Sequence, residues 1–177
     1  ENTITRDRII NARILGPEFE FLPKKEDYYD IDEVTFLKWT TGGPGTYVAG
    51  ISTLPREIKL SATDFRDYLQ HEGLTATINE RKAKGISDKP AIERYSKHVK
   101  AIIQVDDKKT DEFSTALDYP IEFIPISNPY GLSVGDDLRM KLLFKGSPLP
   151  NQVVHIGSRS DLKSGDAKEI ETKTDSR

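Results

Sequence analysis

The stretch LRMKLLFKGSP at residues 138–148 decides the fold class. Its large apolar side chains stand at every second position: Leu138, Met140, Leu142 and Phe144. Side chains two residues apart lie on one face of a β-strand, so this spacing predicts a strand with one face turned to a core. The Gly-Ser-Pro sequence at 146–148 predicts the turn that follows it.

Three further short segments carry a similar signal. They lie at about 121–126, 153–156 and 169–173. Pro125 interrupts the first of them and cannot donate to a ladder, which predicts an edge or first strand. Short strands separated by Gly/Pro turns indicate an antiparallel β-sandwich rather than βαβ units. We therefore expect a sandwich at 119–177 that is incomplete and continues beyond residue 177.

A linker at 106–118 is expected to join this sandwich to an N-terminal β region at 1–105. The linker begins with residues 106–112, a run without an apolar side chain. Before it, apolar residues alternate over 95–105, which favours a strand. A helix remains the alternative for that segment, because no Gly or Pro interrupts it.

A helical hairpin at about 61–85 is predicted inside the N-terminal region. Ser61 with an acidic residue three positions later is an N-cap signature, and apolar side chains then follow at helical spacing. Gly73 supplies the stop for this helix, and a second, more polar helix is expected at about 75–84. Strand-like sequence flanks the hairpin on both sides, so it is expected to be an insertion between strands.

The rest of the N-terminal region is expected to alternate between strands and loops. Segments 4–16 and 31–39 are expected to be strands, with a Pro-containing, charged loop over 17–30 between them. The Gly/Pro-rich residues 40–46 predict a turn that feeds another strand. This turn lacks the Lys and Ser/Thr of a phosphate-binding loop.

Five acidic residues lie in and beside the loop at 17–30: Glu26, Asp27, Asp30, Asp32 and Glu33. Carboxylate oxygens are ligands for calcium. The segment has no Gly-bearing loop of the EF-hand type, so a solvated acidic loop is the preferred interpretation.

Composition excludes several classes of function. The chain has 177 residues, a net charge of -3 and no Cys, so disulfides, thiolate metal sites and cysteine nucleophiles are excluded. Near balance of charge argues against a dedicated nucleic-acid binder. No apolar run is long enough for a membrane-spanning helix, and no signal-peptide core precedes the first strand.

Candidate metal ligands are limited to three histidines and the carboxylates. Nickel, cobalt and zinc accept imidazole, but His71, His98 and His155 show no ligand spacing and would have to converge through the fold. An exposed or hydrogen-bonded histidine is the preferred interpretation for each. The metal-binding residues are therefore unknown from the sequence.

No enzyme is expected, and no catalytic or cofactor-binding residue is assigned. The chain has no Gly-x-Ser-x-Gly elbow and no phosphate-binding loop. Asp136 and Asp137 are adjacent, and neighbouring strand residues point to opposite faces, so this pair cannot flank one glycosidic bond. A turn is the preferred interpretation for it.

Several blocks together resemble one bacterial family. They are GTYV at 45–48, FRDYLQHEGL at 65–74, RYSK at 94–97 with KA at 100–101, YPIEFIPISNPY at 119–130, and GDDL at 135–138 with GSPL at 146–149. In order and spacing they are similar to the domain-of-unknown-function family forty-one ninety-eight. The similarity covers most of residues 45–177.

The resemblance implies a location and a class of function. Members of that family are typically periplasmic or held at the cell envelope, and are often labelled as periplasmic components of nickel or cobalt uptake. Their closing part resembles an immunoglobulin-like or transthyretin-like sandwich of the carboxypeptidase regulatory type, here at 119–177. We therefore expect an exported, periplasmic or extracellular, non-enzymatic binding protein linked to transition-metal uptake. Its expected partner is a metal ion or an envelope protein. The alternative is a structural or adhesive module that binds protein or glycan.

Overall fold

The computed structural model describes residues 4–32, 34–158 and 170–175. They group into two compact units, each assembled from two stretches of the chain. Unit 1 comprises residues 1–55 and 96–148, and unit 2 comprises residues 56–95 and 149–177. Each unit is described separately below.

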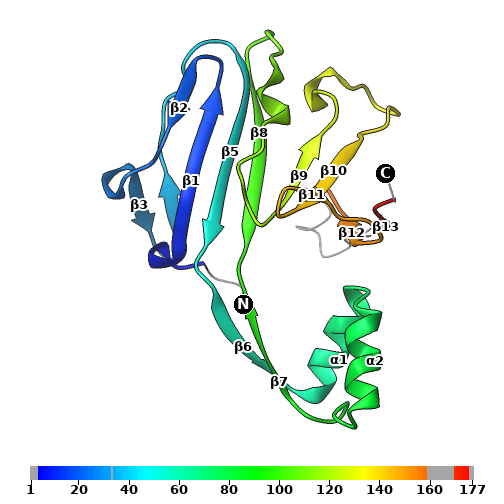
Figure 1. The fold of residues 1–177 in the computed structure, drawn as a ribbon. Coiled ribbons are helices and arrows are strands. Elements are labelled where there is room, and N and C mark those ends of the chain that lie inside the picture. Colours follow the sequence, from blue (N-terminus) through cyan, green and yellow to red (C-terminus); the bar gives the residue numbers. More distant parts are fainter. Residues whose placement is uncertain (1–3, 33, 159–169, 176–177) are drawn as a thin grey trace. The chain divides into compact units, whose positions relative to one another are not determined.

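The main sheet of unit 1 has four antiparallel strands in the order β2-β1-β5-β8. Their bounds are Ile9–Gly16 for β1, Phe19–Phe21 for β2, Gly45–Thr53 for β5 and His98–Val105 for β8. The long central strand β5 pairs with β1 on one side and β8 on the other (Figure 1). Seven of its nine residues are buried, as its position inside the sheet requires.

Two smaller sheets complete unit 1. Strands β3 (Tyr28–Ile31) and β4 (Val34–Leu37) form a hairpin. Strands β9 (Ile121–Pro125), β10 (Met140–Phe144) and β11 (Ser147–Pro148) pair in the order β11-β10-β9. Short 3-10 helices lie at Arg6–Arg8, Lys25–Asp27, Asp111–Ser114 and Pro129–Gly131.

The core of unit 1 forms where residues after β8 pack on β5. Val48 is fully buried and clusters with Leu117 and Tyr119. Gly50 permits this contact, because a Cβ there would lie 2.3 Å from the Leu117 side chain. Residues 106–118, expected to link two domains, thus supply core side chains to unit 1, including Phe113 of a 3-10 helix.

A buried ion pair joins β8 to β9 inside unit 1. The Lys100 ammonium lies 3.1 Å from the Glu122 carboxylate, and both side chains are at least nine-tenths buried. Lys100 also donates to the carbonyl of Thr115, while Glu122 accepts from the backbone N–H of Leu117. Both charges are therefore satisfied by several hydrogen bonds, as buried charges must be.

Unit 2 contains a two-stranded ribbon, a helical hairpin and a second strand pair. Strands β6 (Arg56–Leu60) and β7 (Ala91–Tyr95) pair along their whole length. Helices α1 (Ala62–His71) and α2 (Thr75–Ala83) are inserted between these two strands and pack on each other (Figure 1). Strands β12 (Val153–Ile156) and β13 (Ile170–Lys173) form an antiparallel pair.

Local signals explain where α1 begins and ends. The Ser61 hydroxyl accepts from the backbone N–H of Asp64, which satisfies one of the free donors of the first turn. Gly73 takes a φ of +66°, the left-handed conformation common just after a helix. The predicted helical hairpin is confirmed, and its two helices lie within a few residues of the predicted bounds.

The fold class predicted from the sequence is confirmed: the chain is mainly β, its sheets are antiparallel, and a helical hairpin interrupts the strands. The strand at the proline-containing segment near residue 121 is an edge strand, as predicted. Residue 169, at the start of the last predicted strand, lies outside the described residues.

Some predictions of elements were wrong. The loop expected over 17–30 contains β2, a 3-10 helix and most of β3, and residues 6–8 of the first expected strand are a 3-10 helix. Segment 95–105 is strand rather than helix, but it breaks at residues 96–97, so Tyr95 ends β7 and β8 begins in another sheet. Ser147 and Pro148, expected in a turn, pair with β10.

Candidate metal site

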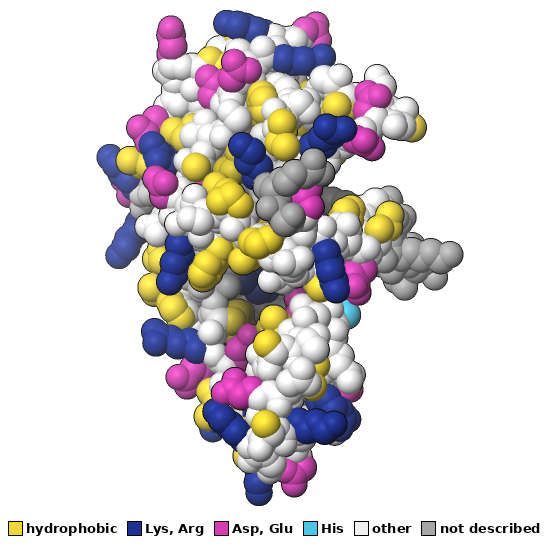
Figure 2. All heavy atoms as spheres, turned by 45° about the vertical axis from the view of Figure 1, so that its right-hand side comes forward, with side chains coloured by type: hydrophobic (Ala, Val, Ile, Leu, Met, Phe, Trp, Pro, Cys, Tyr) yellow, Lys and Arg dark blue, Asp and Glu magenta, His cyan; other side chains and the backbone are white. Residues whose placement is uncertain are grey.

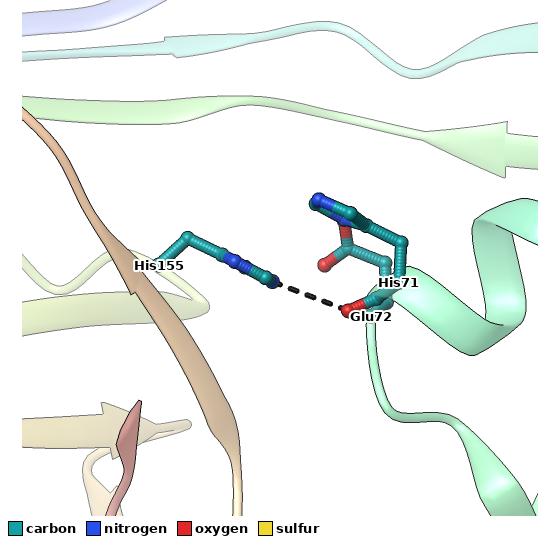
Figure 3. A group of neighbouring side chains, drawn as sticks. All are labelled: His71, Glu72 and His155. Atoms are coloured by element: carbon teal, nitrogen blue, oxygen red, sulfur yellow. Dashed lines mark hydrogen bonds and ion pairs between the residues drawn. The ribbon is translucent and has the colours of Figure 1, made fainter. Parts of the chain in front are cut away.

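Unit 2 brings together two histidines that are 84 residues apart in the sequence. His71 is the last residue of α1, and His155 lies on β12. Their rings are stacked, with centroids 4.3 Å apart and planes inclined by 8°. Glu72 follows His71, and one donor atom from each of the three residues lies within 4.8 Å of the others (Figure 3). In the described part of the chain, this is the one group of three or more potential ligands so close together.

The end of α1 is placed next to β12 by a close contact. A Cβ on Gly73 would lie 2.3 Å from Cγ2 of Val153, so only glycine allows this approach. Val153 is buried, and His155 follows it by two residues and therefore lies on the same face of the strand. The contact at Gly73 thus directs the face that carries His155 toward the end of α1.

Hydrogen bonds fix the protonated nitrogen of each ring. Nε2 of His155 lies 3.2 Å from the carbonyl oxygen of His71, and a carbonyl only accepts, so Nε2 carries the hydrogen (Figure 3). Nδ1 of His71 lies 3.1 Å from the Glu72 carboxylate and donates to it. Metal-binding histidines commonly donate one ring N–H to a carbonyl or a carboxylate in this way.

The stacked arrangement has a consequence for coordination. An imidazole binds a metal with a lone pair that lies in the ring plane, and two stacked, nearly parallel planes do not meet near the rings. One metal ion bound by both histidines therefore requires at least one ring to rotate out of the stack. The side chain of His71 is 58% exposed, which leaves space for that rotation.

The donor set suits a borderline divalent ion. Two imidazoles with a carboxylate are typical of zinc, nickel, cobalt and copper, whereas calcium prefers a shell of oxygen atoms. Exposure of the His71 and Glu72 side chains would leave an ion held there open to solvent.

His98 does not join this site. It lies on β8 in unit 1, where Nδ1 is 2.8 Å from the Ser52 hydroxyl and Nε2 is 3.2 Å from the Ser96 hydroxyl. Burial lowers the pKa of His98 from its usual value. Ser52 is only 2% exposed, so this contact serves the packing of two paired strands.

The acidic residues singled out in the sequence do not form a metal group among the described residues. Asp27 caps a turn by accepting from the backbone N–H of Lys24. Asp30 accepts from Thr35 and Arg6, and the hydroxyl of Thr35 is the larger cause that lowers the pKa of Asp30. Glu33 lies outside the described residues. Asp136 lies in a turn, but at its end and not at its start as the sequence predicted, where its carboxylate accepts from the backbone N–H of Ser133.

Sequence reasoning considered His71 and His155 but could not pair them, and it did not single out Glu72 as a ligand. Local patterns marked each segment but not the contact between them. His71, Glu72 and Gly73 form a helix end at which a glycine allows another strand to approach, and His155 lies on a predicted strand. Only the fold shows that these two segments meet.

The fold and site define a mainly β protein with a partly exposed cluster of two histidines and a glutamate. The chain belongs to the family described as Domain of unknown function (DUF4198), whose model matches residues 13–177. No curated protein and no solved structure matches the chain. None of the described helices is both long and apolar enough to cross a membrane.

Proposed function

We propose that this chain is a non-enzymatic binding protein of the periplasm or cell envelope that takes up a divalent transition-metal ion, nickel or cobalt. The observation that carries the proposal is the convergence of His71, Glu72 and His155 within 4.8 Å. The resemblance described above supports the location and the choice of nickel or cobalt.

Two features favour binding and release over catalysis. The site lies at the surface, with His71 58% exposed, and Figure 2 shows a histidine side chain at the molecular surface. On the face drawn in the same view, Lys and Arg side chains are mixed with Asp and Glu, so that face presents no field of one sign to a charged macromolecule. A small cation recognised by a few donor atoms is consistent with both features.

The test is isothermal titration of the whole chain with nickel and with cobalt chloride. We expect binding of one ion per chain, and a loss of at least about 10-fold in affinity for His71→Ala or His155→Ala. His98→Asn is the matched control, since it removes an imidazole from the other unit. Absence of nickel and cobalt binding by the unaltered chain would refute the proposal, as would a loss in the control equal to that in the site variants.

A second candidate function, an interaction module, is favoured by the β3–β4 hairpin. One face of this hairpin carries four apolar side chains, each more than a third exposed: Tyr29, Ile31, Val34 and Phe36. The rings of Tyr29 and Phe36 stack at 5.4 Å. If this face binds an envelope protein or glycan, Tyr29→Ser with Phe36→Ser abolishes that binding in a binding assay and leaves metal affinity unchanged. Loss of metal binding in the same variant would contradict a separate role for the hairpin.

A further inference from the structure

Glu171 stands directly opposite His155 in the β12–β13 pair. The register joins His155 to Glu171 and Val154 to Thr172. Residues directly opposite each other in an antiparallel pair have their Cβ atoms about 5 Å apart on the same face. The Glu171 carboxylate therefore shares the face that presents His155 to the end of α1.

We propose that Glu171 is a fourth protein ligand of the metal ion bound by His71, Glu72 and His155. This inference rests on the function proposed above. Glu171 is exposed, and a glutamate side chain is long enough to reach across the width of one strand pair. In the structure its carboxylate does not belong to the group of donor atoms within 4.8 Å, so it would swing in as the rings leave their stack.

Ligand number and charge balance favour a second carboxylate in the coordination shell. The Glu72 carboxylate accepts a hydrogen bond from Nδ1 of His71 and so orients that ring. This hydrogen bond uses one of the two carboxylate oxygens of Glu72. The second carboxylate brings the protein ligands to four, the number found in tetrahedral zinc sites. Two neutral imidazoles with two carboxylates also balance the double charge of the ion, which stabilises the bound state.

One cation lies on the same face. Lys173 is two residues from Glu171 on β13, a separation of about 7 Å along the strand. Its ammonium competes with the metal for the Glu171 carboxylate. Lys173→Gln is therefore expected to raise metal affinity, whereas loss of Glu171 lowers it.

The decisive probe is cobalt, because its visible absorption depends on the number and type of coordinating atoms. The whole chain is titrated with cobalt chloride and followed by absorption and by calorimetry. Glu171→Ala is expected to lower affinity at least about 10-fold and to change the visible spectrum of the bound ion. Glu57→Gln, an exposed glutamate of β6, is the charge control, and Thr172→Ala, on the opposite face of β13, is the control for the strand pair.

Each result decides between the two proposals. If His155→Ala abolishes binding while Glu171→Ala keeps the affinity and spectrum of the unaltered chain, Glu171 is not a ligand and the metal function stands. If affinity falls but the spectrum stays the same, Glu171 acts through His155 and the ligand assignment is wrong. If the unaltered chain binds no cobalt or nickel, both proposals fail together.

Discussion

Tyr68 of α1 shows how burial and a neighbouring carboxylate together set the pKa of a residue in the helical hairpin. Its hydroxyl donates to the Glu93 carboxylate at 2.8 Å, and burial together with that carboxylate raises the pKa of Tyr68 to about 12. We expect Glu93→Gln to lower this pKa toward the ordinary 10.0, with burial keeping it above that value. The measurement is the absorbance of tyrosinate between pH 9 and 13. Subtracting the titration of Tyr68→Phe from that of the unaltered chain isolates the titration of Tyr68.

The raised pKa of Tyr68 also predicts how the free energy of unfolding changes with pH. Because the pKa is raised in the folded chain, the folded state keeps a proton that the unfolded state loses above pH 10. The contribution of the protonated Tyr68 hydroxyl to the free energy of unfolding is fully present below pH 10 and is lost as pH rises through 12. An alkaline stability profile that is identical in Tyr68→Phe would contradict this assignment.

The buried pair Lys100–Glu122 gives a second prediction at the scale of single residues. Glu122→Ala leaves the Lys100 ammonium buried without its counter-charge and removes the acceptor for the backbone N–H of Leu117. We expect a loss of about 3–5 kcal/mol in the free energy of unfolding, measured with urea. Replacing both partners, by Lys100→Met with Glu122→Leu, should cost less than the single change, because no charge is then stranded.

An exposed pair is the control for this experiment. Lys84 and Glu80 lie 2.6 Å apart on α2 with both side chains more than half exposed. Exposed pairs contribute little, so Lys84→Ala should leave the urea midpoint nearly unchanged. If Glu122→Ala lowered the free energy of unfolding no more than Lys84→Ala, the burial of the Lys100–Glu122 pair would not add to its contribution to stability.

Elements with strong local signals could be predicted from the sequence, and weakly marked ones could not. The cap at Ser61 and the alternation of residues 138–144 lie within a few positions, so they predicted α1 and β10. Strands β2 and β3 have only three and four residues, so the alternation of Phe19 with Phe21 and of Tyr29 with Ile31 is too short to mark a strand. The break between β7 and β8 depends on which strand each half pairs with, a fact outside any local window.

The site was predictable only in part for the same reason. Because the chain has no Cys and imidazole is a good metal ligand, the sequence limited the candidate metal ligands to three histidines and the carboxylates. Choosing His71 with His155 over His98 requires the contact between α1 and β12. That contact depends on the fit of Val153 against Gly73, which no residue pattern near either histidine encodes.

Gly73 provides a prediction at the scale of elements. Gly73→Ala adds a Cβ where φ is +66° and where Val153 would be 2.3 Å away. We expect a loss of stability larger than the roughly 1–2 kcal/mol of left-handed backbone strain, and weaker cobalt binding, because the end of α1 must move away from β12. Urea unfolding and cobalt titration measure the two effects.

Gly85 is the matched control, since it follows α2 with a φ of +63° and no atom within 4 Å of a Cβ built there. Gly85→Ala should show the backbone strain alone and bind cobalt normally. If the two substitutions changed cobalt affinity equally, the contact between Gly73 and Val153 would not be what positions the metal site.

At the scale of the molecule, the two units differ in how much core they possess. Among the described residues, the buried hydrophobic side chains of unit 2 are Leu69 and Val153, whereas unit 1 has eight. Fewer buried apolar contacts imply a lower free energy of local opening. Unit 2 is therefore expected to exchange its amide hydrogens faster than the central strands of unit 1.

Metal binding should act selectively on that weaker unit. The ligands come from both stretches of unit 2, residues 71–72 and 155, so a bound ion joins segments that local opening separates. An ion bound only by the folded form stabilises it by about 2.7 kcal/mol at 100 times the dissociation constant. Hydrogen exchange with and without nickel should then show slower exchange at the end of α1 and in β12, with β5 and β8 unchanged. The double variant His71→Ala with His155→Ala should show no such slowing. Equal slowing of β5 and α1 would mean that the units open together, and none at α1 would mean that the ion binds elsewhere.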